Sequence, residues 1–81
     1  MRRSQLQWRC RRGMRELDLP LQRYLEFAYE TANPPEQAAF VRLLDETDDA
    51  LRRYLYGGLN PEDPALAELL REIRRAAASH S

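Results

Sequence analysis

Residues 20–35 read PLQRYLEFAYETANPP. Apolar residues recur in this stretch at the three- and four-residue spacing of one helix face, namely Leu21, Tyr24, Leu25, Ala28 and Ala32. The following Asn-Pro-Pro ends the pattern, because proline cannot continue a helix. The stretch therefore predicts an amphipathic helix that begins near Asp18 and Pro20 and ends near Ala32.

A first helix is expected before this segment, from Ser4 to about Arg12. Ser4 is a favoured N-cap residue. The apolar residues that follow at fourfold spacing are Leu6, Cys10 and Met14. Gly13 interrupts the pattern and predicts a helix end or a sharp corner, since glycine adopts positive φ at little cost.

Three helices are expected after the proline pair. One begins at Glu36, a short one is capped by Thr47 or Asp48, and the last follows the turn at residues 60–64. Their expected core residues are Phe40, Leu43, Leu44, Leu51, Tyr54, Leu55, Leu66, Leu69, Leu70, Ile73 and Ala77. The short connections predict antiparallel packing between helices adjacent in the chain.

The composition supports an all-α fold, a compact small bundle of about five short helices. Of the 81 residues, 43% are hydrophobic, and the β-branched ones are only Val41, Ile73, Thr31 and Thr47. A β-sandwich or barrel is therefore excluded. The length predicts one helical domain over residues 1–81, with residues 1–3 and 77–81 frayed.

The same composition limits location and chemistry. One Cys and one His cannot form an internal disulfide or a zinc site. No apolar run approaches the roughly 20 residues that span a membrane, and the first residues lack a signal-peptide pattern. We therefore expect a soluble protein of a reducing compartment.

The charged residues are unevenly distributed. All thirteen basic residues are Arg and balance thirteen acids, which argues against a dedicated DNA-binding protein. Residues 1–15 hold six Arg and no acid, whereas residues 16–49 hold nine acids and two Arg. Two interpretations follow: the segments neutralise each other across the bundle, or the basic segment meets an acidic partner.

No set of residues predicts catalysis. Cys10 lies on the apolar line of the first helix, so a buried structural thiol is favoured over a reactive one. The acids at residues 45–49 suit the junction of two helices, where carboxylates favour the next N-terminus, better than an acid–base pair. No glycine-rich phosphate loop occurs. We expect no enzyme, no metal and no stably bound cofactor.

Residues 8–18, WRCRRGMRELD, contain the candidate site. Four Arg within seven residues repel one another unless negatively charged groups neutralise them. Gly13 allows the chain to bend at this point. Arginine can clamp a carboxylate, and Met offers an adaptable apolar contact. The candidate partner-binding residues are Trp8, Arg11, Arg12, Gly13, Met14, Glu16 and Asp18. In this interpretation Arg12 and Glu16 point outward; the alternative is a capped helix end with a solvated charge run.

The pattern Trp-x-Cys-Arg-Arg-Gly-Met-x-Glu-x-Asp at residues 8–18 resembles the signature of the small bacterial and mitochondrial succinate dehydrogenase assembly factors. The similarity continues through Phe40-x-Arg42-Leu43-Leu44-Asp45 and Leu51-x-x-Tyr54-Leu55. Family members often have Trp near the position of Tyr54, so this chain departs slightly there. The Arg-Gly-x-x-Glu motif of the family corresponds to Arg12, Gly13 and Glu16.

The resemblance implies a factor that binds the flavoprotein subunit of succinate dehydrogenase, and also that of fumarate reductase. It implies that the factor promotes covalent attachment of FAD to a His of that subunit. We expect a monomer that carries no FAD itself, because the chain is too small to enclose a dinucleotide. The alternative is a small helical nucleic-acid-binding or antitoxin-like regulatory protein.

Overall fold

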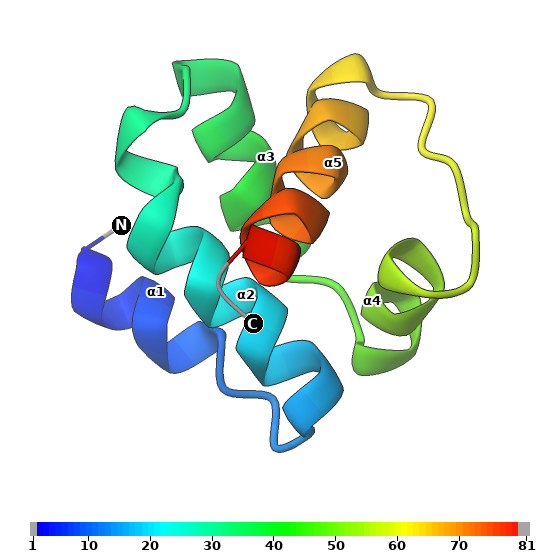
Figure 1. Ribbon diagram of the computed structural model, residues 1–81, viewed down its shortest axis with the longest axis horizontal. Helices are drawn as coiled ribbons and strands as arrows, with labels where there is room; N and C mark the ends of the chain where they lie inside the picture. The colour runs from blue at the N-terminus through cyan, green and yellow to red at the C-terminus, as the bar shows by residue number, and fades with distance from the viewer. Residues whose placement is uncertain (1, 80–81) are drawn as a thin grey trace.

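The computed structural model describes residues 2–79 and, over that range, contains five α-helices and one 3₁₀ turn (Figure 1). The elements are α1 (Arg3–Arg9), α2 (Arg15–Phe27), the 3₁₀ turn η1 (Tyr29–Thr31), α3 (Pro34–Leu43), α4 (Asp48–Leu55) and α5 (Pro64–Ser79). The all-α prediction is confirmed. No helix in the described range is long and apolar enough to cross a membrane.

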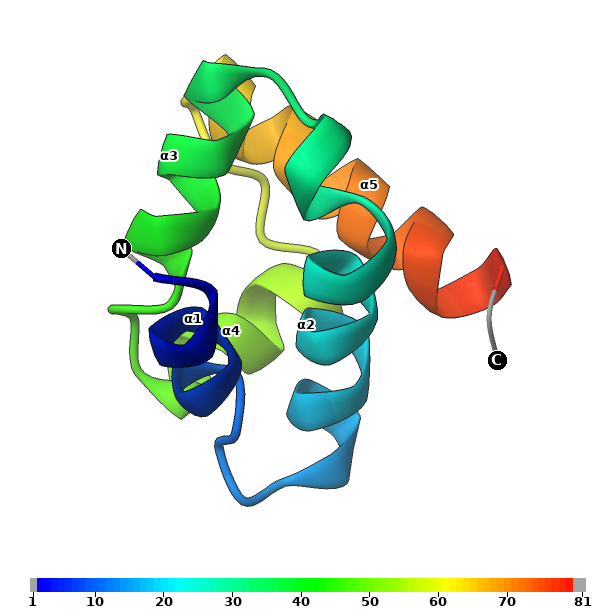
Figure 2. The same ribbon diagram turned by 90° about the vertical axis from the view of Figure 1, so that its left-hand side faces the viewer.

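Helix α5 packs mainly against α2 and α3, while α1 and α4 cover the remaining sides of α2 (Figures 1 and 2). The short connections predict antiparallel packing of chain neighbours, whereas the most extensive packing joins α5 to α2 and α3. Helices α2 and α5, of 13 and 16 residues, are the longest in the described range, and they pack against each other. The molecule is nearly equidimensional, at 28 × 27 × 25 Å.

The core follows the predicted stripes. Side chains that are at most 2% exposed include Leu6, Cys10, Leu17, Leu21, Tyr24, Leu25, Ala39, Phe40, Leu43, Leu44, Leu51, Leu69, Leu70 and Ile73. Glu36 is the one buried carboxylate among residues 2–79, and it accepts a hydrogen bond of 2.6 Å from the Tyr24 hydroxyl, so both polar groups are satisfied. Burial and this bond raise the pKa of Tyr24 above its ordinary value.

Several predicted helix ends are wrong by a few residues. Helix α1 begins at Arg3 rather than after Ser4, and it ends at Arg9 rather than near Arg12. Helix α2 begins at Arg15, so Asp18 lies within its first turns, and it ends at Phe27 rather than Ala32. The end shifts because residues 29–31 tighten into the 3₁₀ turn, whose Tyr29 carbonyl accepts a hydrogen bond from the side-chain Nε2 of Gln37.

The starts of α3 and α4 depend on side-chain caps. Asn33 Oδ1 accepts from the Glu36 amide at 2.9 Å, so α3 begins at Pro34, two residues before the predicted start. Thr47 caps α4 as predicted, accepting from the Ala50 amide at 3.1 Å. Fraying of residues 77–81 stays a prediction: α5 extends to Ser79, and residues 1, 80 and 81 lie outside the described range.

Candidate functional site

The connection between α1 and α2, residues 10–14, is called the Gly13 corner here. It protrudes at the lower end of the molecule in both views (Figures 1 and 2). Gly13 is exposed and has a φ of +84°, while a Cβ added to it would meet no atom within 4 Å. Gly13 is therefore required for the backbone turn, and none of the described residues occupies the space where a side chain at this position would begin.

Arg12 points into the molecule, which contradicts the expected outward orientation. Its Nε donates to Asp48 Oδ1 at 2.8 Å. Its Nη1 and Nη2 donate to the carbonyls of Leu44 and Glu46 at 2.9 and 2.6 Å, and its side chain is only 16% exposed. Carbonyls after a helix end lack intrahelical donors, so this connection attracts a guanidinium. Arg12 thereby ties the Gly13 corner to the α3–α4 connection.

Asp18 and Met14 also support the corner rather than lie freely on its surface. Asp18 Oδ1 accepts from the Arg12 backbone N–H at 2.6 Å, which holds the turn against the first part of α2. Met14 is the N-cap residue of α2 and is partly buried against the core. Its sulfur lies 2.9 Å from Arg52 Nη2.

The other four candidate residues, Trp8, Arg11, Gly13 and Glu16, are exposed, with Trp8 at 73%. Trp8, Arg11 and Arg12 line a shallow hollow of about 480 Å³ together with Asp45 and Asp48; we call it the corner hollow. Within residues 2–79, Arg11 forms no ion pair, whereas Glu16 Oε1 lies 3.5 Å from Arg52 Nη2. Only these four of the seven predicted partner-binding residues are therefore exposed to a partner at this corner.

The uneven charges along the chain neutralise one another in space. Three ion pairs join the basic first segment to the acidic middle segment: Arg3–Glu30 at 2.8 Å, Arg9–Asp45, and Arg12–Asp48 at 2.8 Å. The interpretation of neutralisation across the bundle is confirmed for these pairs. Arg11 and Arg15 are left without an ion pair in the described part of the chain.

Cys10 is a buried structural thiol, as predicted. Its side chain is fully enclosed, and burial raises the pKa of the thiol to about 12; this effect outweighs the lowering of the pKa by Arg12, and Asp18 adds a smaller increase. The thiol is therefore protonated at neutral pH and a poor nucleophile. Among residues 2–79 no group of three His, Cys, Asp or Glu side chains is placed to hold a metal ion.

The acids at residues 45–49 occupy the junction between α3 and α4, as expected. Asp45 pairs with Arg9 and Asp48 with Arg12, while Asp49 lies 3.2 Å from Arg53 one turn along α4. These carboxylates neutralise arginines and complement the N-terminus of α4. The arrangement is structural and offers no poised acid–base pair.

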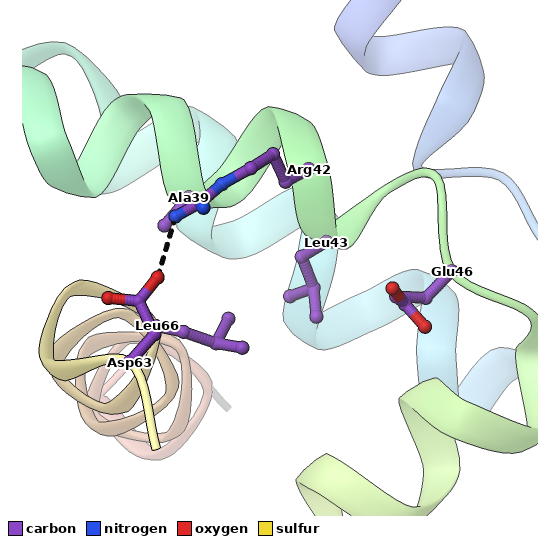
Figure 3. A pocket seen from close by; sticks show the side chains of 6 residues that line it. All are labelled: Ala39, Arg42, Leu43, Glu46, Asp63 and Leu66. Atoms are coloured by element: carbon purple, nitrogen blue, oxygen red, sulfur yellow. Dashed lines mark hydrogen bonds and ion pairs between the residues drawn. The ribbon is translucent and has the colours of Figure 1, made fainter. Parts of the chain in front are cut away.

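A second hollow of about 270 Å³ lies between α3 and the start of α5 (Figure 3). Arg42 Nη2 donates to Asp63 Oδ2 at 2.8 Å across it, and Asp63 Oδ1 accepts from the Ala65 amide at 3.0 Å. The bonds from the Ala65 amide and from Arg42 hold the pKa of Asp63 below its ordinary value. Arg42 and Asp63 thus stabilise the start of α5.

Two residues near the corner, Arg52 and Tyr56, were not predicted from the sequence. Arg52 reaches from α4 to both Met14 and Glu16, and the Tyr56 hydroxyl donates to the Glu16 carbonyl at 2.6 Å. Both contacts join residues about 40 positions apart, which no local pattern reveals. The available signal was the aromatic Tyr56 directly before two glycines at a helix end.

Comparison with known proteins agrees with the motif. A family model described as "Flavinator of succinate dehydrogenase" matches residues 4–77. The protein of Methylococcus capsulatus called FAD assembly factor SdhE is 51% identical over 72 residues, which cover 89% of this chain and 87% of that protein. The proteins of the same name from Pectobacterium atrosepticum and Coxiella burnetii are 39% and 34% identical, over 88% and 93% of this chain and 81% and 92% of their own lengths.

No solved structure matches the chain significantly. The family match spans both flanks of the Gly13 corner, α3, α4 and almost all of α5. The alignments with the Methylococcus capsulatus and Coxiella burnetii proteins cover similar shares of both partners, so these relatives are nearly as long as this chain. The chain therefore belongs to the family of succinate dehydrogenase flavinators, the FAD assembly factors.

Proposed function

We propose that this protein promotes covalent attachment of FAD to the flavoprotein subunit of succinate dehydrogenase by binding that subunit at the Gly13 corner. The observation that carries the proposal is the family match together with the position of the motif. Gly13 and Glu16 are exposed at a protruding turn, which internal bonds of Arg12 and Asp18 hold in place. A preorganised loop binds with a smaller entropic cost than a flexible one.

The mechanism is stabilisation of one conformation of the client. The Cys10 thiol is buried and unreactive, so we propose that this chain acts by binding and not by a chemical step of its own. Its effect is limited to the difference in its affinity for the competent and incompetent client conformations. FAD and the His that receives it both belong to the client, and this protein acts as a monomer without FAD of its own.

The flavoprotein of fumarate reductase is proposed as a second client in the bacterial cytoplasm. The nucleic-acid and antitoxin-like alternatives are not favoured by the family match. The ion pairs of Arg3, Arg9 and Arg12 also weaken the nucleic-acid alternative, since they occupy cations that would otherwise contact phosphates.

The experiment combines apo-flavoprotein, FAD and this protein, and reads covalent flavin by in-gel fluorescence after denaturation. The wild type is expected to raise the yield, and Gly13→Arg to return it to the level without factor while the far-UV circular dichroism stays helical. The added side chain has room but would project from the docking corner, and its positive φ costs about 1 kcal/mol.

Gly58→Arg is the matched control, because Gly58 also has a positive φ of +74° and open space around a Cβ. It adds the same charge and the same strain outside both the motif and the corner hollow. Equal yields for wild type and Gly13→Arg would remove the Gly13 corner from the docking surface. Loss of activity in Gly58→Arg as well would assign the effect to strain or charge alone.

A further inference from the structure

A third hollow, of which most lining residues belong to α2, includes Glu16 of the motif, and we call it the α2 hollow. Its lining includes Arg15, Glu16, Leu19, Arg23, Tyr56 and Ala77. It shares no residue with the corner hollow, which is lined by residues before Gly13 and by the α3–α4 junction. Glu16, the last residue of the Arg-Gly-x-x-Glu motif, therefore lines a surface whose other residues lie outside the fixed positions of that motif.

The α2 hollow exposes apolar side chains in a fixed arrangement. Tyr56 is 61% exposed, yet its hydroxyl donates to the Glu16 carbonyl at 2.6 Å. This bond holds the ring against the first turn of α2. Leu19 is 37% exposed and lies one turn beyond Arg15 on the same helix. A held aromatic ring beside an exposed Leu loses little side-chain entropy when a partner covers it.

The charges of the α2 hollow are predominantly positive. Arg15 forms no ion pair among residues 2–79, and the Arg23 guanidinium donates only to the Ala77 carbonyl, at 3.2 Å, in that range. The single carboxylate, Glu16, lies 3.5 Å from Arg52 of α4. The α2 hollow therefore contains two arginines and one carboxylate, and that carboxylate already lies beside a third arginine. The resulting positive charge complements an acidic partner.

We infer that the α2 hollow is a second docking surface for the same flavoprotein. It binds a client segment that places an aliphatic or aromatic side chain on Tyr56 and Leu19 and a carboxylate beside Arg15. Tyr and Arg are the residue types that most often dominate binding energy at protein interfaces. The surface is continuous with the motif through Glu16. This inference rests on the proposed function, because it assigns the occupant to the same client.

The test is titration of apo-flavoprotein with four variants, each first checked for helicity. Tyr56→Ser and Arg15→Ala are each expected to raise Kd by about tenfold. Tyr56→Phe, which keeps the ring but loses the hydroxyl, should raise it by less than about threefold. Arg15→Glu should weaken binding more than Arg15→Ala, since the new carboxylate repels that of the client.

Leu59→Ser and Arg71→Ala are the matched controls, because Leu59 is 44% exposed and Arg71 is exposed on α5, and neither lines the α2 hollow. Wild-type affinity in Tyr56→Ser and Arg15→Ala, with Gly13→Arg still inactive, would overturn the second docking surface and leave the proposed function standing. Activity in Gly13→Arg as well would overturn the proposed function itself. If Tyr56→Ser changed only self-association, measured by sedimentation, the hollow would be a contact between copies, and the inference would be wrong.

Discussion

Cys10 illustrates how burial decides the chemistry of a single residue. The thiol lies in the core next to the corner, and burial raises its pKa to about 12. The nearby Arg12 would favour the thiolate, but its guanidinium is committed to Asp48 and two backbone carbonyls. The four Arg of this segment therefore do not create a reactive cysteine.

The raised pKa predicts alkaline destabilisation. In the unfolded chain the thiol ionises near pH 9, whereas the folded protein retains the proton until about pH 12. The unfolded state then binds fewer protons, so the free energy of unfolding falls as pH rises between these values, by at most about 1.4 kcal/mol per pH unit for one group. Tyr24, whose pKa is also raised, adds to the fall.

Urea unfolding at pH 8, 9 and 10 measures this dependence in the wild type and in Cys10→Ala. The variant loses packing, so it should be less stable at pH 8, but its stability should decline less steeply above pH 9. Parallel declines in the two proteins would show that Cys10 does not contribute the titration. A thiol reagent at pH 8 should react with native Cys10 far more slowly than with the unfolded chain.

At the scale of the elements, the helices follow from apolar periodicity, and their ends depend on polar groups that periodicity does not reveal. The stripe from Leu21 to Ala32 predicted α2, but the last turn became the separate 3₁₀ turn. Thr47 was recognised as a cap because Thr favours that position. Asp18 was predicted to start a helix, but it lies inside α2. Its carboxylate does not cap α2; it accepts a hydrogen bond from the backbone N–H of Arg12 in the preceding turn.

The candidate site was predicted in position but not in orientation. Gly13 indicated the corner through a purely local property, its tolerance of positive φ. The inward direction of Arg12 depends on Leu44, Glu46 and Asp48, which lie 32 to 36 residues away. A sequence pattern shows that Arg12 precedes Gly13, but only the fold shows which groups accept hydrogen bonds from its guanidinium.

The linkage of the two connections by Arg12 predicts a stability effect. Arg12→Ala leaves Asp48 without its cation and two carbonyls without donors, and should lower the free energy of unfolding by about 2 kcal/mol. For a domain of this size the melting temperature should fall by about 8–16 °C. Thermal unfolding followed by circular dichroism measures this directly.

Arg11→Ala is the matched control, because Arg11 is the exposed neighbour that forms no ion pair in residues 2–79. Its change in unfolding free energy should stay within about 0.5 kcal/mol. In the double variant Arg12→Ala/Asp48→Ala the two effects should be less than additive, since both remove the same interaction. Equal melting temperatures for Arg11→Ala and Arg12→Ala would contradict the structural role of Arg12.

At the scale of the whole molecule, folding converts a segregated sequence into a largely neutralised surface. The Arg-rich first segment lies against the acidic junction of α3 and α4, and two of its three arginines without an ion pair in residues 2–79 flank Gly13: Arg11 before it and Arg15 after it. An exposed aromatic side chain accompanies each one in its hollow, Trp8 with Arg11 and Tyr56 with Arg15. The fold thereby concentrates exposed binding groups around one corner.

A test of the docking surface needs control residues of the same charge that are exposed away from the motif. Glu68 and Arg71 pair with each other on the exposed side of α5, at 46% and 66% exposure. They match Glu16 and Arg11 in charge and exposure but lie outside the motif.

The most direct measurement is therefore the affinity of apo-flavoprotein for Arg11→Ala and Glu16→Ala, compared with Arg71→Ala and Glu68→Ala. Interface charges that become desolvated cost at least about 2 kcal/mol when truncated, so the corner variants should bind about thirtyfold more weakly. Exposed ion pairs contribute about 0–1 kcal/mol, so the α5 variants should lose no more than about fivefold. Equal losses in the four variants would contradict docking at the Gly13 corner and would assign binding to the overall charge of the molecule.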